Sequence, residues 1–150
     1  MRRIDEYLLP GLIVCRSSAV DRSALIAELA RLIAVATGVP ASVVAEAVRE
    51  RERYGTTAVG NGVAIPHCRL KGIKDITLAV ATLECPVEYD APDGAGVGLV
   101  FLIVVPEGNN LAYLKLLSRI SVLANDRTMR QRLMAAVDAA DIMHIVREAP

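Results

Sequence analysis

The sequence predicts a mixed α/β fold (α+β mixed), in which a single mixed β-sheet is flanked by helices on both sides. Residues 97–105 form an unbroken apolar, β-rich run, which is typical of a central strand covered on both faces. Segments with helical periodicity lie before, between and after the expected strands. Because a sheet in such a chain must bury both of its faces, the helices are expected to pack on both sides of it.

Four elements are expected in the first third of the chain. In order, they are a helical turn at 4–8, a strand at 12–15, a helix between Asp21 and Gly38, and a helix between Pro40 and Gly55. Asp21 is a typical N-cap, because its side chain can accept a hydrogen bond from a backbone N–H of the first turn. Gly38 and Gly55 are expected to end the two helices, since glycine readily takes the conformation that follows a helix.

The next segment, residues 56–70, changes character. Gly60, Gly62 and Pro66 favour a loop with short extended pieces. The remaining elements are expected in this order: a strand at 76–83, a short strand at 87–89, a turn at 90–94, the central strand at 97–105, and helices at 110–124, 128–137 and 141–148. Pro106 is expected to stop the central strand, since proline has no N–H to donate to a sheet.

Length and composition limit the class of protein. The chain has 150 residues, which fits one globular domain, and it has no internal repeat or low-complexity tract. We therefore expect residues 1–150 to form one domain. Formal net charge is zero, from 17 basic and 17 acidic residues, whereas nucleic-acid binders usually carry a basic excess. Aromatic residues that could stack on bases are also scarce, so no nucleic-acid partner is expected.

The N-terminus lacks the pattern of a secretion signal. Asp5 and Glu6 interrupt the apolar stretch that follows the first basic residues, and a signal peptide needs an unbroken one. The apolar run at 97–105 is too short to span a bilayer. The three cysteines form no Cys-x-x-Cys pair and are odd in number, as expected for free thiols in a reducing cytosol. We therefore expect a cytoplasmic protein without membrane insertion.

His67 is the strongest candidate for chemistry. It ends the segment Gly-Asn-Gly-Val-Ala-Ile-Pro-His. Gly60 and Gly62 permit positive φ or a close approach to a ligand, and N–H groups of such a turn can point at an anion. Pro66 fixes its own φ and favours an extended Ile65. A stiff backbone thus presents an imidazole suited to meet a phosphate; the alternative is a structural histidine whose ring nitrogens bond to the backbone.

Three stretches of sequence carry a family resemblance. They are RERYGTTAVGNGVAIPH at 51–67, VEYDAPDG at 87–94 with the apolar run at 97–106, and LKLLSRI at 114–120. The first closely resembles the active-site signature of the fructose/mannitol-type IIA domains of the bacterial phosphotransferase system, and the other two resemble the same family. The resemblance covers about residues 8–146, and the Gly-Asn-Gly pattern is most similar to the nitrogen-regulatory branch. It implies a IIA type-2 domain, a component of a transferase system for sugar transport or its regulation.

The resemblance implies roles for three residues. In that family the histidine of Ile-Pro-His accepts a phosphoryl group from a small histidine phosphocarrier protein, which makes His67 the acceptor. An imidazole suits this role, since its pKa lies near neutrality. Arg51 matches the family's arginine beside that histidine, where a guanidinium fork fits phosphate oxygens. The alternative for Arg51 is a surface charge paired with Glu50 or Glu52. Thr57 is a weaker candidate, whose hydroxyl can bond the ring or phosphate, or can simply lie at a strand end.

Two positions depart from the family pattern. Tyr113 stands where the family usually has a second histidine, and a neutral phenol supplies no positive charge at pH 7. Its effect on transfer is therefore open, with ordinary packing as the alternative. Cys68 follows the active histidine, where the family usually has a small residue such as glycine. A thiol at this place can be redox-sensitive, and the alternative is a small, tolerated side chain.

The other polar candidates are expected to be structural. His144 belongs to the last expected helix, as a half-buried or C-terminal helix histidine. Asp90 and Asp93 have Pro and Gly neighbours, which favours a turn over a catalytic carboxylate pair. With two histidines and no Cys-x-x-Cys pair, no metal site is expected, and nothing in the sequence implies a cofactor.

Three uses of His67 remain. The favoured one is regulation, in which the phosphorylation state of His67 decides which target protein is bound, because no IIB or membrane segment occurs in the sequence. The second is metabolic relay of the phosphoryl group to a fructose/mannitol-type IIB domain. The third is a binding module that keeps the fold but is no longer phosphorylated, which the missing second histidine would suit. Whether the protein acts as an enzyme is left open by these alternatives.

Overall fold

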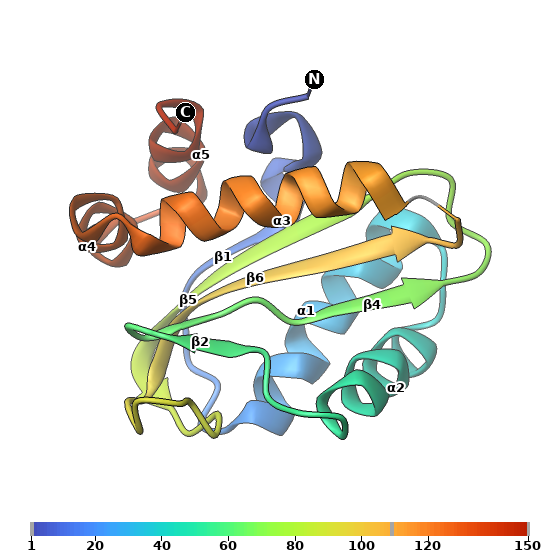
Figure 1. The fold of residues 1–150 in the computed structure, drawn as a ribbon, viewed down its shortest axis with the longest axis horizontal. Helices are drawn as coiled ribbons and strands as arrows, with labels where there is room; N and C mark the ends of the chain where they lie inside the picture. Colours follow the sequence, from blue (N-terminus) through green and yellow to red (C-terminus); the bar gives the residue numbers. More distant parts are fainter. Residues whose placement is uncertain (1, 109, 150) are drawn as a thin grey trace.

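The computed structural model describes residues 2–108 and 110–149, and within them the chain folds into one six-stranded sheet with helices on both faces (Figure 1). The strands are β1 (Ile13–Ser17), β2 (Ala58–Gly60), β3 (Val63–Ala64), β4 (His67–Leu70), β5 (Thr77–Val87) and β6 (Val97–Pro106). The helices are α1 (Arg22–Thr37), α2 (Ala41–Glu52), α3 (Asn110–Asn125), α4 (Arg127–Ala135) and α5 (Ala139–Arg147), and two 3₁₀ turns, Ile4–Tyr7 and Pro10–Leu12, precede β1. The predicted mixed α/β fold is confirmed.

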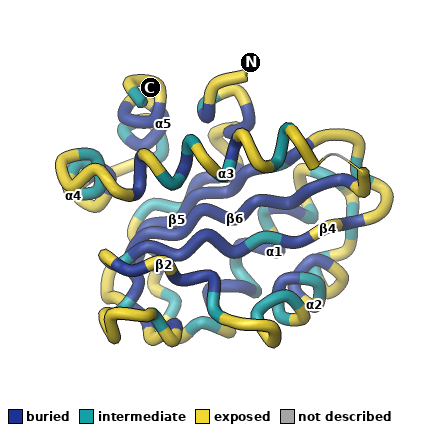
Figure 2. Tube along the Cα trace, viewed as in Figure 1, coloured by how far each residue is buried: buried dark blue, intermediate teal, exposed yellow. Residues whose placement is uncertain are grey.

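Strand β6 is the centre of the sheet. It runs antiparallel to β5, where Val80 pairs with Phe101, and parallel to β3 and β4 on its other edge. Every residue of β6 is buried, as the dark trace through the middle of the molecule shows (Figure 2). The apolar run therefore forms a central strand covered on both faces, as its composition predicts.

Helices α1 and α3 lie on opposite faces of the sheet. In Figure 1, α3 crosses in front of the strands and α1 passes behind them, while α4 and α5 lie beside each other at one end. Helix α1 begins as expected, because the Asp21 side chain accepts a hydrogen bond from the N–H of Ala24 at 2.7 Å. It ends at Gly38, which has a φ of 80°.

Strands β3 and β4 lie along the same edge of β6, with a break between them at Ile65 and Pro66. Proline has no N–H to donate, and it is tolerated in this break because only its carbonyl is used: the Pro66 oxygen accepts from the N–H of Ile103 at 2.9 Å. This confirms the prediction of short extended pieces in a loop. Because of this break, His67 is the first residue of β4, and β4 packs next to α2.

The prediction of a separate short strand at 87–89 is wrong. Strand β5 continues through Val87, which pairs with Val97 beyond an irregularity in the register. Asp90 then has a φ of 53°, which a strand cannot accommodate. Tyr89 turns its side chain into the protein, where it is 1% exposed, and a buried hydrogen bond described below takes the place of strand pairing.

Candidate functional site

His67 is held by both of its ring nitrogens. Nδ1 lies 3.1 Å from the carbonyl oxygen of Ile65, and Nε2 lies 3.1 Å from Nε of Arg51. A carbonyl can only accept a hydrogen bond and a guanidinium can only donate one. These two contacts therefore assign the proton to Nδ1 and the lone pair to Nε2. The backbone bond is the one that the structural alternative expected, but it leaves the second nitrogen unprotonated and next to a cation.

The surroundings of His67 favour its neutral form. Partial burial of the ring is the largest effect on its pKa and lowers it below the ordinary value of 6.5. The hydrogen bond to the Ile65 backbone opposes this, the positive charge of Arg51 lowers the pKa further, and the charge of Glu52 raises it slightly. A neutral imidazole keeps the Nε2 lone pair available. The ring is thus a nucleophile at neutral pH without a base to activate it.

We expect the His67 imidazole to titrate below pH 6.5 in an NMR experiment, with the Nδ1–H tautomer dominant above the midpoint. The lowered pKa means that the unfolded chain binds this proton more readily than the native protein. His67 therefore makes the protein less stable as pH falls from the unfolded pKa of about 6.5 toward the folded one. A midpoint at or above 6.5, or an Nε2–H tautomer, would contradict the arrangement of the ring.

Arg51 comes from the last turn of α2 and bridges to the loop after it. Besides the contact with His67, its Nη1 donates to the carbonyl of Gly55 at 3.1 Å. The alternative pairing with its acidic neighbours does not occur, because Glu50 pairs with Arg53 and Glu52 bonds elsewhere. The guanidinium is therefore held beside the imidazole by two acceptors, His67 Nε2 and the Gly55 carbonyl.

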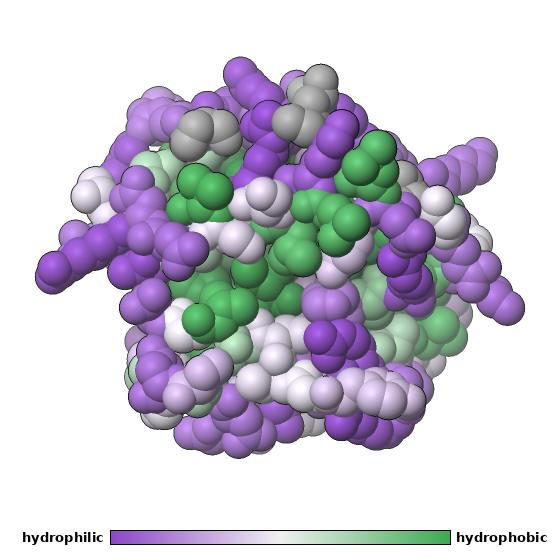
Figure 3. Space-filling model, viewed as in Figure 1, coloured by the Kyte–Doolittle hydropathy of each residue, from purple (hydrophilic) through white to green (hydrophobic). Residues whose placement is uncertain are grey.

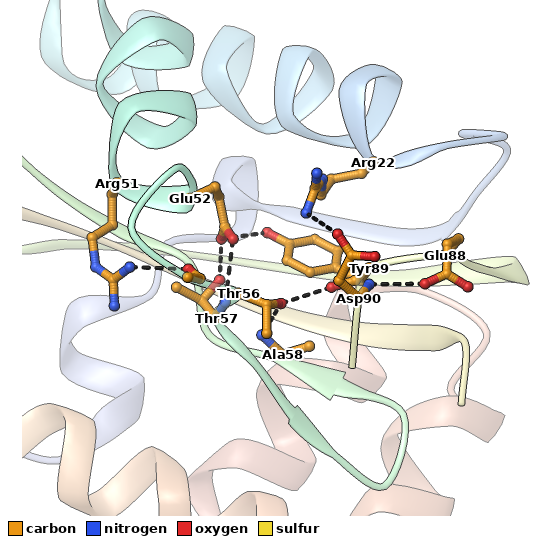
Figure 4. A network of polar contacts seen from close by, with 10 residues as sticks. Arg22, Arg51, Glu52, Thr56, Thr57, Ala58, Glu88, Tyr89 and Asp90 are labelled. Atoms are coloured by element: carbon orange, nitrogen blue, oxygen red, sulfur yellow. Dashed lines mark hydrogen bonds and ion pairs between the residues drawn. The ribbon is translucent and has the colours of Figure 1, made fainter. Parts of the chain in front are cut away.

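Glu52 belongs to a network of polar contacts shown in Figure 4. Its carboxylate accepts from the hydroxyl and the N–H of Thr57, the latter at 3.2 Å, and from the Tyr89 hydroxyl at 2.9 Å. The Thr56 hydroxyl in turn donates to the carbonyl of Tyr89 at 2.7 Å. The structure thus places Thr57 on Glu52 rather than on the His67 ring. The network ties the end of α2, which carries Arg51, to the segment that follows β5.

Replacing Tyr89 with phenylalanine is expected to destabilise the protein by about 2 kcal/mol, because a buried hydrogen bond to a charged group is lost and a carboxylate lone pair is left unsatisfied. Burial raises the pKa of Tyr89, so the native phenol keeps its proton to donate. Chemical denaturation measures the change. Tyr54→Phe is the matched control, since Tyr54 is 82% exposed. Equal stability of both variants would show that the Tyr89 hydroxyl contributes nothing.

Tyr113, from the first turns of α3, packs against the imidazole. The two ring centroids lie 5.6 Å apart with the planes tilted by 42°. Burial raises the pKa of Tyr113, so the phenol is neutral at pH 7. Tyr113 therefore does lie beside His67, where the family has its second histidine, but it brings a ring and a hydroxyl instead of a charge.

Arg69 also belongs to this group, although its sequence pattern did not single it out. Its guanidinium lies 5.8 Å from the centre of the Tyr113 ring, and it donates a hydrogen bond to the Asn110 side chain. The signal was strand periodicity: two residues apart on β4, His67 and Arg69 share one face, while Cys68 is buried on the other. This alternation was overlooked because residues 56–70 were predicted to be mainly a loop.

These side chains line a pocket of about 380 Å³. Its walls include Arg51, His67, Arg69 and Tyr113, so both residues of the Nε2 contact line it. Cys68 also borders the pocket, but burial raises the pKa of its thiol to about 12. A thiol with this pKa is a poor nucleophile at neutral pH, which agrees with a small, tolerated side chain.

The glycine turn of the motif lies outside this pocket. Gly60, Asn61 and Gly62 all have positive φ, as the glycines allow, and they form the bend between β2 and β3. The N–H of Asn61 donates to the Asp93 carboxylate at 2.9 Å. The anion that this turn binds is therefore an internal carboxylate, and Asp93 has the turn-forming role expected of it.

The remaining candidates lie apart from His67. Asp90 pairs with Arg22 at 3.6 Å. His144 lies on α5 with its side chain 73% exposed, 3.2 Å from Glu148, so it is a C-terminal helix histidine rather than a half-buried one. Within the described parts of the chain, no three His, Cys, Asp or Glu side chains gather closely enough to hold a metal ion.

Apolar side chains are exposed at the pocket and on α3, the helix that carries Tyr113. Tyr54 borders the pocket, and Leu111 and Leu114 of α3 are 68% and 56% exposed. Figure 3 shows apolar side chains gathered in the middle of this face, with hydrophilic ones around them. Such a surface can bind another protein. Of the helices in the described residues, none has the length and apolar character needed to cross a membrane.

The fold and this site define a class of protein: an α/β domain that presents one unprotonated imidazole nitrogen, beside the Arg51 guanidinium, in an open pocket. Such a site can take an anionic group onto the nitrogen. Sequence and structure comparisons place the chain within that class. A family model described as the phosphoenolpyruvate-dependent sugar phosphotransferase system, EIIA 2, matches residues 6–149. The chain belongs to this family and is a IIA domain.

Individual relatives agree. The nitrogen regulatory protein of Pseudomonas aeruginosa is 36% identical over 149 residues, which cover 97% of this chain and 96% of that protein. The crystal structure of the nitrogen regulatory protein IIA-Ntr from Neisseria meningitidis matches with a TM-score of 0.91 and 33% identity, covering 95% of this chain and 98% of that one. The Escherichia coli mannitol IIA, solved in complex with phosphorylated IIB, matches with a TM-score of 0.78 over 93% of this chain and 96% of that one; at 14% identity, this likeness concerns the fold.

Proposed function

We propose that this IIA domain accepts a phosphoryl group on Nε2 of His67 from a small histidine phosphocarrier protein in the cytoplasm, and that the phosphorylation state of His67 regulates a target protein. The observation that carries the proposal is the pair of contacts on the His67 ring. The Ile65 carbonyl holds the proton on Nδ1, and the lone pair on Nε2 faces the pocket beside Arg51.

The arrangement suits the chemistry of phosphoryl transfer. The bond between phosphorus and the donor nitrogen breaks as a bond to Nε2 forms, and Nδ1 keeps its proton on Ile65. No proton therefore has to leave the acceptor ring. What the protein must supply is an in-line approach and positive charge for the phosphoryl oxygens. Arg51 is anchored on Gly55 at 3.1 Å, so its guanidinium can turn from Nε2 to the new oxygens without leaving the pocket.

Two uses of the phosphorylated domain are compatible with this chemistry. Regulation is supported by the nitrogen regulatory proteins that match along nearly the whole chain. Relay to a IIB domain is supported by the shared fold of the Escherichia coli mannitol IIA, which was solved with its phosphorylated IIB. We favour regulation, because the regulatory relatives share more sequence with this chain.

Incubation with a phosphocarrier protein and its phosphoenolpyruvate-driven kinase tests the proposal. The expected result is a gain of one phosphoryl group in the intact mass of the protein. The Pseudomonas aeruginosa relative serves as a positive control for the donor system. If that relative gains the group and this protein does not, the domain is a binding module that has kept the fold alone.

We expect a target protein to distinguish the two forms by at least about tenfold in affinity, or ~1.4 kcal/mol. Phosphorylation adds about two negative charges to a pocket with exposed apolar side chains around it, and a partner that covers the pocket must desolvate those charges or pair them. The measurement is a pull-down with both forms, followed by titration of each specific partner. Equal affinities, together with rapid loss of the phosphoryl group to a IIB domain, would favour relay.

A further inference from the structure

We propose that Arg69 is a second phosphate-binding residue, which provides the positive charge that Tyr113 cannot; this inference rests on the proposed phosphorylation of His67. A phosphoryl group on Nε2 carries about two negative charges. Arg51 alone offsets one of them, and the neutral Tyr113 phenol offsets none. Within the pocket walls, Arg69 is the other guanidinium.

The geometry places Arg69 within reach of that group. It follows His67 by two residues on β4, and both side chains project from the same face of the strand. The Tyr113 ring lies close to both side chains: its centroid is 5.6 Å from the centre of the His67 ring and 5.8 Å from the Arg69 guanidinium. The positive charge of Arg69 already lowers the pKa of His67, which reports the same proximity. Arg51 and Arg69 therefore approach the imidazole from different elements, α2 and β4.

The contacts of Arg69 hold it ready without using up its donors. One nitrogen, Nη2, donates to the Asn110 side chain, and the plane lies over the Tyr113 ring, an arrangement that favours a cation. A guanidinium has five N–H donors, so others can serve phosphate oxygens. Arg69 is exposed, so the movement toward a phosphoryl group opposes no tight packing. Tyr113 then acts as a platform for this cation in place of a second histidine.

The test uses phosphoramidate as the phosphoryl donor, because no protein partner then contacts Arg69. In that reaction the P–N bond of phosphoramidate breaks, ammonia leaves, and the new bond forms at Nε2. We expect Arg69→Ala to slow phosphorylation by about tenfold. This is less than the effect of removing a fully preorganised donor, because the Arg69 side chain is exposed. We also expect it to shift the ³¹P resonance of the phosphohistidine. Arg69→Lys should retain part of the rate. Lys71→Ala, which removes the same charge from a nearby exposed position outside this pocket, should change neither quantity.

A second variant separates charge from structure. Adding Tyr113→His to Arg69→Ala should restore much of the lost rate, since a histidine beside the phosphoryl group can become a cation. Thermal melts of each variant show whether it is folded. A normal rate and ³¹P shift in Arg69→Ala would overturn the inference, and so would a rate that Tyr113→His and Arg69→Lys both fail to restore. If the unmodified protein takes up no phosphoryl group from phosphoramidate or from a phosphocarrier, the proposed function itself has failed.

Discussion

His67→Ala is expected to abolish phosphorylation completely. The Nε2 lone pair of His67 lies beside Arg51, and both residues line the pocket. The Cys68 thiol also borders it, but its pKa is raised to about 12, which makes it a poor nucleophile at neutral pH. His144 is the remaining histidine of the sequence, and it lies exposed beside Glu148, whose negative charge opposes an incoming phosphoryl group.

The measurement is uptake of radiolabelled phosphoryl groups from a phosphocarrier protein. In the unmodified protein the label should be lost in acid and survive in alkali, as expected for phosphate bound to nitrogen. His144→Ala is the matched control and should take up label normally. Label on His67→Ala, or label that survives acid, would assign phosphorylation to another residue. A melting temperature of His67→Ala close to that of the unmodified protein is needed to show that the variant is folded and has lost only the uptake of label.

Arg51→Ala is expected to slow phosphoryl transfer by ~10²-fold or more, the usual cost of removing one preorganised donor that stabilises developing charge. The guanidinium already lies 3.1 Å from Nε2 and is anchored on Gly55, so it needs little rearrangement to reach the phosphoryl oxygens. The effect on stability should be small, because Arg51 lies at the end of α2 and only part of its side chain is buried.

Initial rates with a phosphocarrier donor, read beside thermal melts, test this. Arg53→Ala is a matched control, since Arg53 lies two residues away and pairs with Glu46 and Glu50 at the exposed side of α2. It removes the same charge without touching the pocket and should transfer normally. Arg51→Lys keeps the charge but loses the planar fork, so its rate should fall between the two. If the melting temperature of Arg51→Ala is much lower while its folded fraction transfers the phosphoryl group at the normal rate, Arg51 is a structural residue.

Much of the fold could be predicted from sequence because its signals are local. The continuous apolar run at 97–105, the Asp21 cap and the glycine at position 38 each depend on neighbours along the chain, and each appears in the structure within a residue of the expected place. The prediction of a short strand at 87–89 was wrong because a contact distant in the sequence decides the structure there. Its β-favouring residues suit a strand, but the Tyr89 hydroxyl bonds to Glu52, 37 residues earlier, and that buried contact is not visible in a local pattern.

For the site, the candidate residues could be named from the sequence: the Ile-Pro-His motif with its upstream arginine, and the tyrosine at the place of a second histidine. Their contacts depend on the folded arrangement. It brought Arg51 to Nε2 of His67, turned Thr57 toward Glu52, directed the glycine turn at Asp93 and added Arg69 to the pocket. Hydrogen bonds and screened charges act over short distances in space. Thr57 and Glu52 are five positions apart, but the other hydrogen-bonded partners lie 16 to 37 positions apart in the chain. The packing of helices and strands around one sheet brings them together, which no spacing along the sequence specifies.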